Sequence, residues 1–546
     1  MSEHATNLQQ VAADAFGWDE LRPEQLSAME YTMQGRDVLA VLPTGAGKSA
    51  IYQVPALLIP GPTLVVSPLL ALQQDQLDGI DTANAPKAVA VNSLQRRSER
   101  RQAWQAVSAG DAEYLFLAPE QLAKEEVVEQ LHEVGVGLFV VDEAHCVSAW
   151  GHDFRPDYRR VGEVIDRLGH PPVIALTATA APSVRSDIVE RLRLKDHGEV
   201  IASFDRPNLR LTVQRQVDER RKRDAVVAHV RTMLAEPGPR LGLLYVASRK
   251  DAEHYAGELR AAGARADHYH AGRKRTDRER LHEEFVADRL DVVVATSAFG
   301  MGIDKPDVRF VVHASAPESL DSYYQQIGRG GRDGEPADIT LFYRPEDLHL
   351  QRFLTARSAP EKALVEVADS LAEAEVPLSA SDLADQVTTS PSPRTHALNL
   401  LEQAGSVSTD DQGRWEYLDP DLDPEDAVCA AVRVAEAHQR LTRSRIEMMR
   451  GYAETSGCRR QFLLGYFGEQ LPHPCGNCDT CTAGTAQAVP AEERLYPINA
   501  SVQHSEWGRG VVMSVEQDRL TVLFDDVGYK TLALAAVERH QLLTLA

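Results

Sequence analysis

The chain contains 546 residues, of which 43% are apolar, 25% charged and 6% aromatic, a composition typical of soluble globular proteins. At about 150 residues per domain, this length predicts about three or four domains, each with its own core. The 58 Lys and Arg against 81 Asp and Glu give a formal net charge of −23, which excludes a uniformly basic surface but not a locally basic groove. Because the sequence has no long apolar run and MSEHATNLQQ lacks the pattern of a secretory signal, we expect a cytoplasmic protein without membrane contact.

Short apolar runs alternate with helical stretches in two successive blocks. In residues 1–202 the runs lie at 38–42, 63–67, 114–118, 137–142 and 173–178. In residues 203–350 they lie at 241–248, 291–297, 308–314 and 338–343. Fully apolar strands separated by helical lengths indicate parallel sheets that are covered on both faces. The fold class is therefore α/β, with two doubly wound domains in tandem.

A different pattern begins after Tyr343. Residues 351–425 contain two short amphipathic helices, at 378–387 and 393–405, followed by a strand, a turn and a strand at 407–418. Helix, turn, helix and hairpin is the order of a winged-helix-like domain.

The C-terminal third predicts three further segments. Residues 426–485 are helical and end in a cysteine cluster, and residues 486–499 are expected to form a linker. Residues 500–546 contain short strands separated by turn residues, which predicts a small β-barrel of SH3 or Tudor type.

A glycine-rich segment follows the first apolar run. It is a compact relative of the phosphate loop, with the sequence Leu42-Pro43-Thr44-Gly45-Ala46-Gly47-Lys48-Ser49. The glycines allow backbone N–H groups to converge on phosphate oxygens. We expect Lys48 to contact the β- and γ-phosphates of ATP and the Ser49 hydroxyl to bind Mg²⁺. The alternative is an ordinary glycine-rich turn.

Two adjacent carboxylates, Asp142 and Glu143, end the apolar run at 137–142 in the sequence DEAH. A carboxylate at the end of a parallel strand is expected beside the phosphate loop. Asp142 would bind Mg²⁺ through water, and Glu143 would orient and deprotonate the attacking water. An Asp-Glu pair can also simply cap a helix, but together with Lys48 it predicts a nucleoside triphosphatase.

Several segments resemble the motifs of one enzyme family, the RecQ DNA helicases. They are FGWDELRPEQ (16–25), DEAHCVSAWGHDFRPDY (142–158), ALTATA (175–180), SFDRPNL (203–209), AFGMGIDKP (298–306) and QQIGRGGRDG (325–334). The match follows the family's order and resumes at CRRQ (458–461) through Cys481. The resemblance implies that both α/β domains are RecA-like and that the protein uses ATP to act on DNA.

The resemblance also implies roles around the nucleotide. Trp18 would stack on adenine while Arg22 and Gln25 hydrogen-bond its edge, although Trp18 could instead belong to the core. Arg329 and Arg332 would serve as arginine fingers from the second α/β domain, with Gln325 also at the nucleotide. For Arg332, a surface ion pair with Asp333 is the alternative.

An aromatic-rich loop follows the DEAH sequence. Its members Trp150 and Phe154 offer faces on which bases can stack. Arg155 could reach phosphate or the ATP side, and His152 lies close in sequence to the DEAH carboxylates. By resemblance, these four residues sense single-stranded DNA and license hydrolysis. A packed aromatic cluster without a ligand is the alternative.

Four cysteines near the C-terminus have metal-ligand spacing. Cys458 is followed by Cys475, Cys478 and Cys481 with two residues between each of the last three. Four thiolates form a closed tetrahedral zinc site that is structural and not catalytic. A redox dithiol is the competing interpretation.

Two features depart from the family pattern. The winged-helix-like segment precedes the cysteine cluster, whereas in the family it follows, so the strand-separating hairpin cannot be transferred directly. The wing around Gly413, Arg414, Trp415 and Tyr417 is a candidate replacement. The C-terminal segment resembles the Tudor-like tail of some superfamily 1 helicases, which suggests a protein partner such as RNA polymerase.

The sequence thus predicts an ATP- and Mg²⁺-dependent 3′-to-5′ DNA helicase with one structural Zn²⁺, acting in repair or recombination. We expect a nucleoid-associated monomer that binds single-stranded and partly duplex DNA. Two alternatives remain: a DNA-dependent translocase with weak unwinding, and a recruitment factor in which ATP turnover is only a gate.

Overall fold

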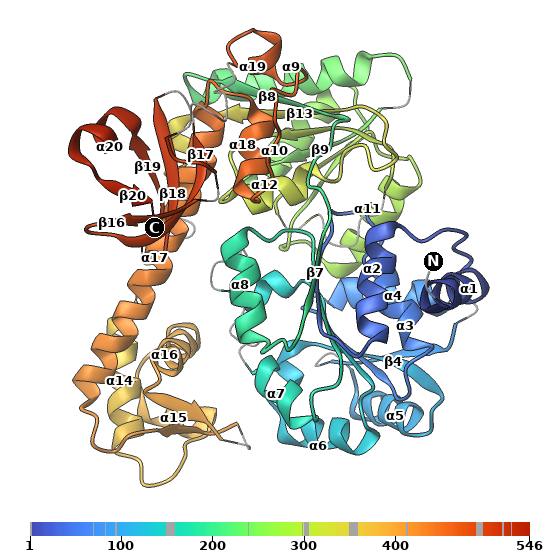
Figure 1. Cartoon of the computed structure of the whole chain (residues 1–546), viewed down its shortest axis with the longest axis vertical. Helices are drawn as coiled ribbons and strands as arrows, with labels where there is room; N and C mark the ends of the chain where they lie inside the picture. Colours follow the sequence, from blue (N-terminus) through green and yellow to red (C-terminus); the bar gives the residue numbers. More distant parts are fainter. Residues whose placement is uncertain are drawn as a thin grey trace.

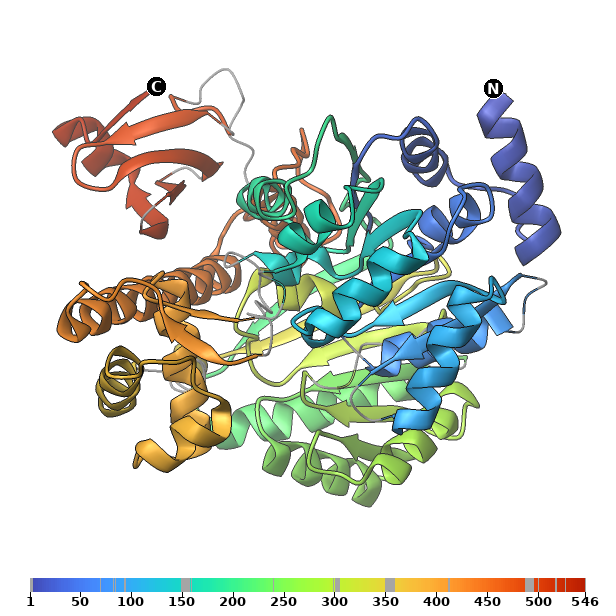
Figure 2. The ribbon, with the colours of Figure 1, turned by 90° about the horizontal axis from the view of Figure 1, so that it is seen from below.

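The structure is a computed structural model, in which two α/β domains stack on each other and smaller units lie along one side (Figures 1 and 2). It describes residues 3–545 except 69, 82, 84, 93–94, 149–157, 159, 239, 298, 300–304, 349–358, 411–412, 487–494, 499, 516–517 and 526. Within the described part of the chain, none of the helices is both long and apolar enough to span a membrane.

The first α/β domain contains a seven-stranded parallel sheet in the order β3-β4-β2-β5-β6-β1-β7. Its strands are β1 (Val38–Val41), β2 (Thr63–Val66), β3 (Lys87–Val91), β4 (Ala112–Leu117), β5 (Leu138–Val141), β6 (Val173–Thr177) and β7 (Gly198–Ile201). Its helices are α1 (Glu3–Phe16), α2 (Pro23–Met33), α3 (Ala50–Ala56), α4 (Leu70–Asp81), α5 (Arg97–Ser108), α6 (Glu125–Val134), α7 (Val161–Arg167) and α8 (Pro182–Arg191), with short 3-10 turns η1 (Pro119–Gln121) and η2 (Ala144–Val147).

The second α/β domain contains a six-stranded parallel sheet in the order β10-β11-β9-β12-β13-β8. Its strands are β8 (Leu209–Arg215), β9 (Leu241–Tyr245), β10 (Ala266–Tyr269), β11 (Val292–Ala295), β12 (Val308–His313) and β13 (Ala337–Tyr343). The helices are α9 (Glu219–Ala235), α10 (Arg249–Ala261), α11 (Arg275–Val286) and α12 (Leu320–Ile327).

Both sheets are buried on both faces, as the apolar runs predict. In β1, Leu39 and Val41 belong to one buried cluster, whereas Val38 and Ala40 belong to another. Successive side chains of a strand point to opposite faces, so two separate clusters require a covered face on each side. The prediction of two tandem doubly wound, RecA-like domains is confirmed.

A third unit precedes the cysteine cluster. It contains α14 (Glu361–Ala372), α15 (Ala380–Gln386), α16 (Pro391–Gln403) and the antiparallel hairpin of β14 (Val407–Thr409) and β15 (Trp415–Tyr417). Three helices followed by a hairpin match the order of a winged helix. We call β14, β15 and the turn between them the wing hairpin.

A single long helix, α17 (Pro424–Glu454), joins this winged unit to the α/β domains (Figure 1). Ala427, Ala431 and Ala435 in its first half complete the core of the winged unit. Met449 and Tyr452 in its second half belong to the large core of the α/β domains. The predicted boundary between residues 425 and 426 therefore falls at the start of a helix that both units share.

The chain ends in two small units. The short helices α18 (Arg459–Tyr466) and α19 (Asp479–Thr482) carry the cysteines. The last residues form an antiparallel sheet in the order β19-β18-β17-β16-β20, with strands β16 (Ser501–His504), β17 (Gly508–Val515), β18 (Arg519–Phe524), β19 (Gly528–Ala533) and β20 (Leu543–Leu545), and helix α20 (Leu534–His540). This sheet packs against α18, where the rings of Tyr529 and Tyr466 lie 5.5 Å apart.

Candidate active site

A cavity of about 860 Å³ lies between the two α/β domains. We call it the cleft. All the residues predicted to contact the nucleotide or its hydrolysis line it, although they come from distant segments: Trp18, Arg22, Gln25, Thr44, Gly45, Ala46, Gly47, Lys48, Ser49, Asp142, Glu143, Gln325, Arg329 and Arg332. The last three belong to the second domain, so the cleft is completed across the domain boundary.

The phosphate loop connects β1 to α3 and depends on two glycines. Gly45 and Gly47 have φ values of +83° and +67°, a left-handed conformation that other residues adopt only with strain. A Cβ atom on Gly47 would also lie 2.7 Å from Nε2 of Gln25. The Lys48 ammonium lies in the base of the loop and donates to the carbonyl of Leu42 at 3.4 Å.

Gln25 supports the phosphate loop directly. Its Nε2 donates to the carbonyls of Ala46 and Gly47 at 3.0 and 2.9 Å, and its Oε1 accepts from the backbone of Arg22 at 2.8 Å. The amide group that the sequence predicts on the adenine edge is thus hydrogen-bonded to the loop in this structure. Trp18 is half-buried and stacks on Phe16 with centroids 4.6 Å apart; it lines the cleft and also packs against a small hydrophobic core.

The two carboxylates lie opposite the phosphate loop at the end of β5. Asp142 is buried and accepts from the backbone N–H of Glu143 at 2.9 Å and from the Ser67 hydroxyl at 3.4 Å. Burial, and then the neighbouring Glu143, raises the pKa of Asp142 to about 7. Burial lowers the pKa of Lys48, and both carboxylates oppose that shift.

Contacts that the sequence did not reveal link the DEAH segment to the second domain. Oε2 of Glu143 lies 3.2 Å from Nδ1 of His145, which in turn lies 3.0 Å from Oγ1 of Thr177. The Thr177 hydroxyl donates to the carbonyl of Thr179, whose own hydroxyl accepts from Nε2 of Gln325 at 3.4 Å. Hydroxyl residues at strand ends are too common for a sequence to identify this chain of contacts.

The loop that carries Arg329 and Arg332 follows α12 and is hydrogen-bonded to Arg206 in the linker between the two domains. Nη2 of Arg206 donates to the carbonyls of Gly330 and Gly331 at 2.9 and 2.8 Å. These bonds fix the backbone between Arg329 and Arg332, both of which face the cleft.

Asp333, the alternative ion-pair partner considered for Arg332, contacts a second arginine. Asp333 pairs with Arg309, with one N–O distance of 3.1 Å. The side chain of Arg332 passes next to Gly45, because a Cβ added there would lie 3.4 Å from Cδ of Arg332. Arg332 thus reaches the phosphate loop of the facing domain.

The four residues predicted to couple DNA to hydrolysis, Trp150, His152, Phe154 and Arg155, lie outside the described residues. The described residues at the two ends of that loop contact the first domain. The Ser148 hydroxyl donates to Asp187 at 2.7 Å, and the Tyr158 hydroxyl donates to the carbonyl of Asp142 at 3.3 Å. Tyr158 thus lies beside Asp142, whereas Ser148 is bound to α8.

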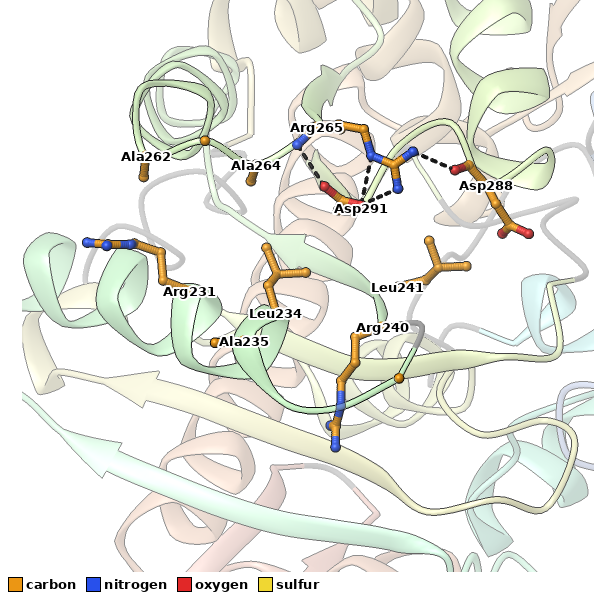
Figure 3. A pocket seen from close by; sticks show the side chains of 12 residues that line it. Arg231, Leu234, Ala235, Arg240, Leu241, Ala262, Ala264, Arg265, Asp288 and Asp291 are labelled. Atoms are coloured by element: carbon orange, nitrogen blue, oxygen red, sulfur yellow. Dashed lines mark hydrogen bonds and ion pairs between the residues drawn. The ribbon is translucent and has the colours of Figure 1, made fainter.

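A second cavity, of about 570 Å³, lies in the second domain at the amino ends of its strands (Figure 3). Nε of Arg265 contacts Asp291 at 3.0 Å, and Nη1 donates to the carbonyl of Asp288 at 3.0 Å. Parallel α/β sheets bind ligands at the carboxyl ends of their strands, so we do not assign the active site to this cavity.

The four cysteines come together as their spacing predicts. The sulfur atoms of Cys458, Cys475, Cys478 and Cys481 all lie within 4.8 Å of one another. The Cys475 and Cys481 sulfurs are 3.9 Å apart, close to the edge of about 3.8 Å in a tetrahedron with Zn–S bonds of about 2.3 Å. The donor set and its spacing fit a closed zinc site.

Comparison with known proteins agrees with this geometry. Residues 22–188 match the DEAD/DEAH box helicase family, and residues 222–334 match the helicase conserved C-terminal domain. Residues 422–482 match the RecQ zinc-binding family, and residues 500–541 match a family described as a protein of unknown function (DUF3553). The two α/β domains and their cleft are thus those of a helicase.

Two individual relatives identify the helicase family more closely. The chain is 35% identical over 478 residues to the probable ATP-dependent DNA helicase RecS of Bacillus subtilis (strain 168), covering 87% of this chain and 92% of RecS. It is 31% identical to the ATP-dependent DNA helicase RecQ of the same organism, covering 98% of this chain and 77% of that protein. The chain belongs to the RecQ family of ATP-dependent DNA helicases. The DUF1998 helicase MrfA bound to DNA shares the fold, with a TM-score of 0.53 at 19% identity over 78% of this chain and 60% of that one.

Proposed function

We propose that the protein uses ATP hydrolysis to move 3′ to 5′ along single-stranded DNA and to separate partly duplex DNA in repair or recombination. The observation that carries the proposal is the cleft, in which the phosphate loop and DEAH carboxylates of one domain face Arg329 and Arg332 of the other. Because the cleft crosses the domain boundary, ATP binding favours domain closure and hydrolysis permits opening. Alternating grip by the two domains converts this cycle into movement along the strand.

Within the cleft we assign the chemistry to four residues. Lys48 binds the β- and γ-phosphates, and Glu143 takes the proton of the attacking water. The buried carboxylate of Asp142 and the Ser49 hydroxyl are oxygen donors of the kind that Mg²⁺ prefers. Burial and Glu143 raise the pKa of Asp142, and a bound cation would lower it again. Mg²⁺ bound with ATP would supply charge neutralisation on the phosphates.

The remaining residues of the cleft are assigned to nucleotide recognition and domain coupling. Arg329 and Arg332 neutralise charge that develops on the γ-phosphate when the domains close. Trp18 and Arg22 contact the adenine, whereas Gln25 positions the phosphate loop through its two carbonyl contacts. Gln325, through its contact with Thr179, relays closure to the DEAH segment.

For DNA sensing we retain Trp150, His152, Phe154 and Arg155 as the proposed residues. The contact between Tyr158 and the Asp142 carbonyl supports this role, because it ties the end of the loop to the catalytic carboxylate. Bases stacked on Trp150 and Phe154 would then influence the position of Asp142 and Glu143.

We propose the wing hairpin as the strand-separating element. Nη2 of Arg160, the residue that caps α7, donates to the carbonyl of Thr409 at 2.7 Å. Arg160 follows the aromatic-rich loop in the sequence, so the hairpin is bound to the described residue that comes just after the segment proposed to sense DNA.

One experiment tests the proposal: strand displacement on 3′-overhang, 5′-overhang, forked and blunt duplexes with ATP, run beside a translocation assay. We expect unwinding from the 3′ overhang and the fork only. Translocation without strand displacement would favour the translocase alternative. Rescue of function in cells by Lys48→Ala would favour the recruitment factor.

We further propose that the protein is a monomer located with the nucleoid and that residues 500–546 bind a protein partner, with RNA polymerase as the candidate. The resemblance of this segment to the tails of some superfamily 1 helicases supports the partner. Light scattering and a binding assay with purified RNA polymerase, with and without residues 500–546, test both statements.

A further inference from the structure

Two histidines and a glutamate come together in the second α/β domain, apart from the cleft and from the cysteines. They are Glu253 on α10, His268 on β10 and His270 directly after β10. We propose that these three side chains form a second metal site, which takes Zn²⁺ and leaves one coordination position open.

The backbone places both imidazoles on the same face at the end of β10. His268 and His270 are two residues apart at the end of a strand, so their side chains point to the same face. Their rings stack with centroids 5.3 Å apart and an interplanar angle of 27°. Glu253 approaches from α10, and one ligand atom from each of the three residues lies within 4.8 Å of the others.

The distance between two of the ligand atoms matches a tetrahedral ion. Nε2 of His270 lies 3.3 Å from Oε1 of Glu253, yet the pair lacks hydrogen-bond geometry. Zn–N and Zn–O bonds of about 2.0 Å at the tetrahedral angle separate two ligand atoms by about 3.3 Å. The two atoms are thus placed as neighbours in one coordination shell.

The burial of His270 gives an independent reason to expect a ligand. His270 is only 5% exposed, and neither of its ring nitrogens has a hydrogen-bond partner. Buried polar groups without partners are rare in proteins and often mark a bound water or ion. A metal ion on Nε2 would satisfy this nitrogen.

The surrounding charges permit a cation. Asp267 lies 3.2 Å from Nδ1 of His268 and 3.2 Å from Arg273, so it offsets that arginine and places a carboxylate behind the imidazole. Arg249 lies near Gly272, where a Cβ would be 3.1 Å from its Nη1 and 3.2 Å from Nδ1 of His270. This positive charge favours an anionic ligand at the open position. Three protein ligands with one open position are typical of zinc sites that bind a further group.

The test uses full-length protein purified with zinc on the four cysteines. Zn²⁺ is titrated by calorimetry, and Co²⁺ is titrated while its visible ligand-field absorption is followed. We expect one further equivalent of each metal. Glu253→Gln and His268→Ala should each weaken it by more than about 10-fold. His254→Ala is the matched control, because His254 is an exposed histidine on the same helix, 3.3 Å from Glu258.

Circular dichroism of each variant verifies folding, and Glu253→Gln changes an exposed side chain, so loss of binding there cannot be attributed to a damaged core. Elemental analysis confirms that the cysteine-bound zinc is retained. The proposal is overturned if no second equivalent binds, or if the second equivalent binds equally well to Glu253→Gln and His268→Ala.

Discussion

The ionisable side chains in the cleft influence one another's pKa values. Lys48, Asp142 and Glu143 are brought together in the cleft from the phosphate loop and the end of β5. Each charge would be costly to bury alone; the two carboxylates offset Lys48, whereas Glu143 raises the pKa of Asp142. Removing Lys48 therefore leaves the two carboxylates without their counter-charge, so stability is measured beside activity in each variant.

The first prediction concerns hydrolysis. Lys48→Ala removes the phosphate cation, and Glu143→Gln removes the base while keeping the shape of the side chain. Losing a positioned base typically lowers the rate by about 10²–10⁴-fold, so DNA-stimulated ATPase should fall by that factor in Glu143→Gln. A fluorescent ATP analogue should still bind to this variant. Glu129→Gln, on the exposed side of α6, is the control, and near-normal turnover in Glu143→Gln would refute the assignment.

The second prediction follows from the pKa of Asp142, which burial raises from 3.8 to about 7. Between these values the folded protein binds a proton that the unfolded chain has released, so its free energy of unfolding falls as the pH rises. Asp142→Asn cannot titrate. Without nucleotide, the melting temperature of wild type relative to Asp142→Asn should therefore decrease from about pH 4 to pH 7. A constant difference across this range would show that Asp142 is ionised throughout.

At the scale of elements, the interior strands could be predicted from sequence and the edges could not. The apolar runs correspond to β1, β2, β4, β5, β6, β9, β11, β12 and β13. The strands without such a run, β3, β7, β8 and β10, are the four edges of the two sheets. An edge strand is partly exposed, as in the alternating burial of β7, so it lacks a continuous apolar run.

The candidate site, too, could be predicted from the sequence only in part. The phosphate loop and DEAH segment are local motifs whose chemistry can be recognised in a few adjacent residues. The contact of Gln25 with the phosphate loop and the contact of Arg160 with the wing hairpin join segments 21 and 249 residues apart. No local pattern encodes such contacts, because they depend on how whole elements pack.

The third prediction concerns the wing hairpin. Arg160→Ala removes the donor to the Thr409 carbonyl and should release the hairpin from the first domain. If the hairpin separates strands, unwinding of a forked duplex should fall several-fold while single-strand-stimulated ATPase changes little. Arg167→Ala is the control, because Arg167 ends the helix that Arg160 caps and pairs with Glu125 at the surface. Equal loss of unwinding and ATPase would indicate a general defect in DNA binding.

At the scale of the whole molecule, the zinc-binding region contacts both the second domain and the linker between the two domains. Its Asp479 accepts from the backbone of Val213 on β8 at 2.9 Å. Its Glu469 accepts from the Ser203 hydroxyl and the Phe204 backbone at 2.6 and 2.7 Å. The ring of Phe467 stacks on Phe204 with centroids 4.5 Å apart. The zinc-binding region therefore contacts the segment that joins the two domains and about which we propose that they close.

The last prediction concerns removal of the cysteine-bound zinc by Cys478→Ser. Apparent binding free energies of structural zinc sites are on the order of 10 kcal/mol, comparable to the stability of a domain, so the variant should be strongly destabilised. Cys478 caps α19, whose first residue is Asp479, so the damage should reach β8 and the linker beyond the cysteines themselves. Hydrogen exchange should increase at residues 203–215 but not in the interior strand β5. Cys429→Ser, at an exposed cysteine of α17, is the control. Faster exchange confined to residues 458–481 would show that the zinc site stabilises only its own segment.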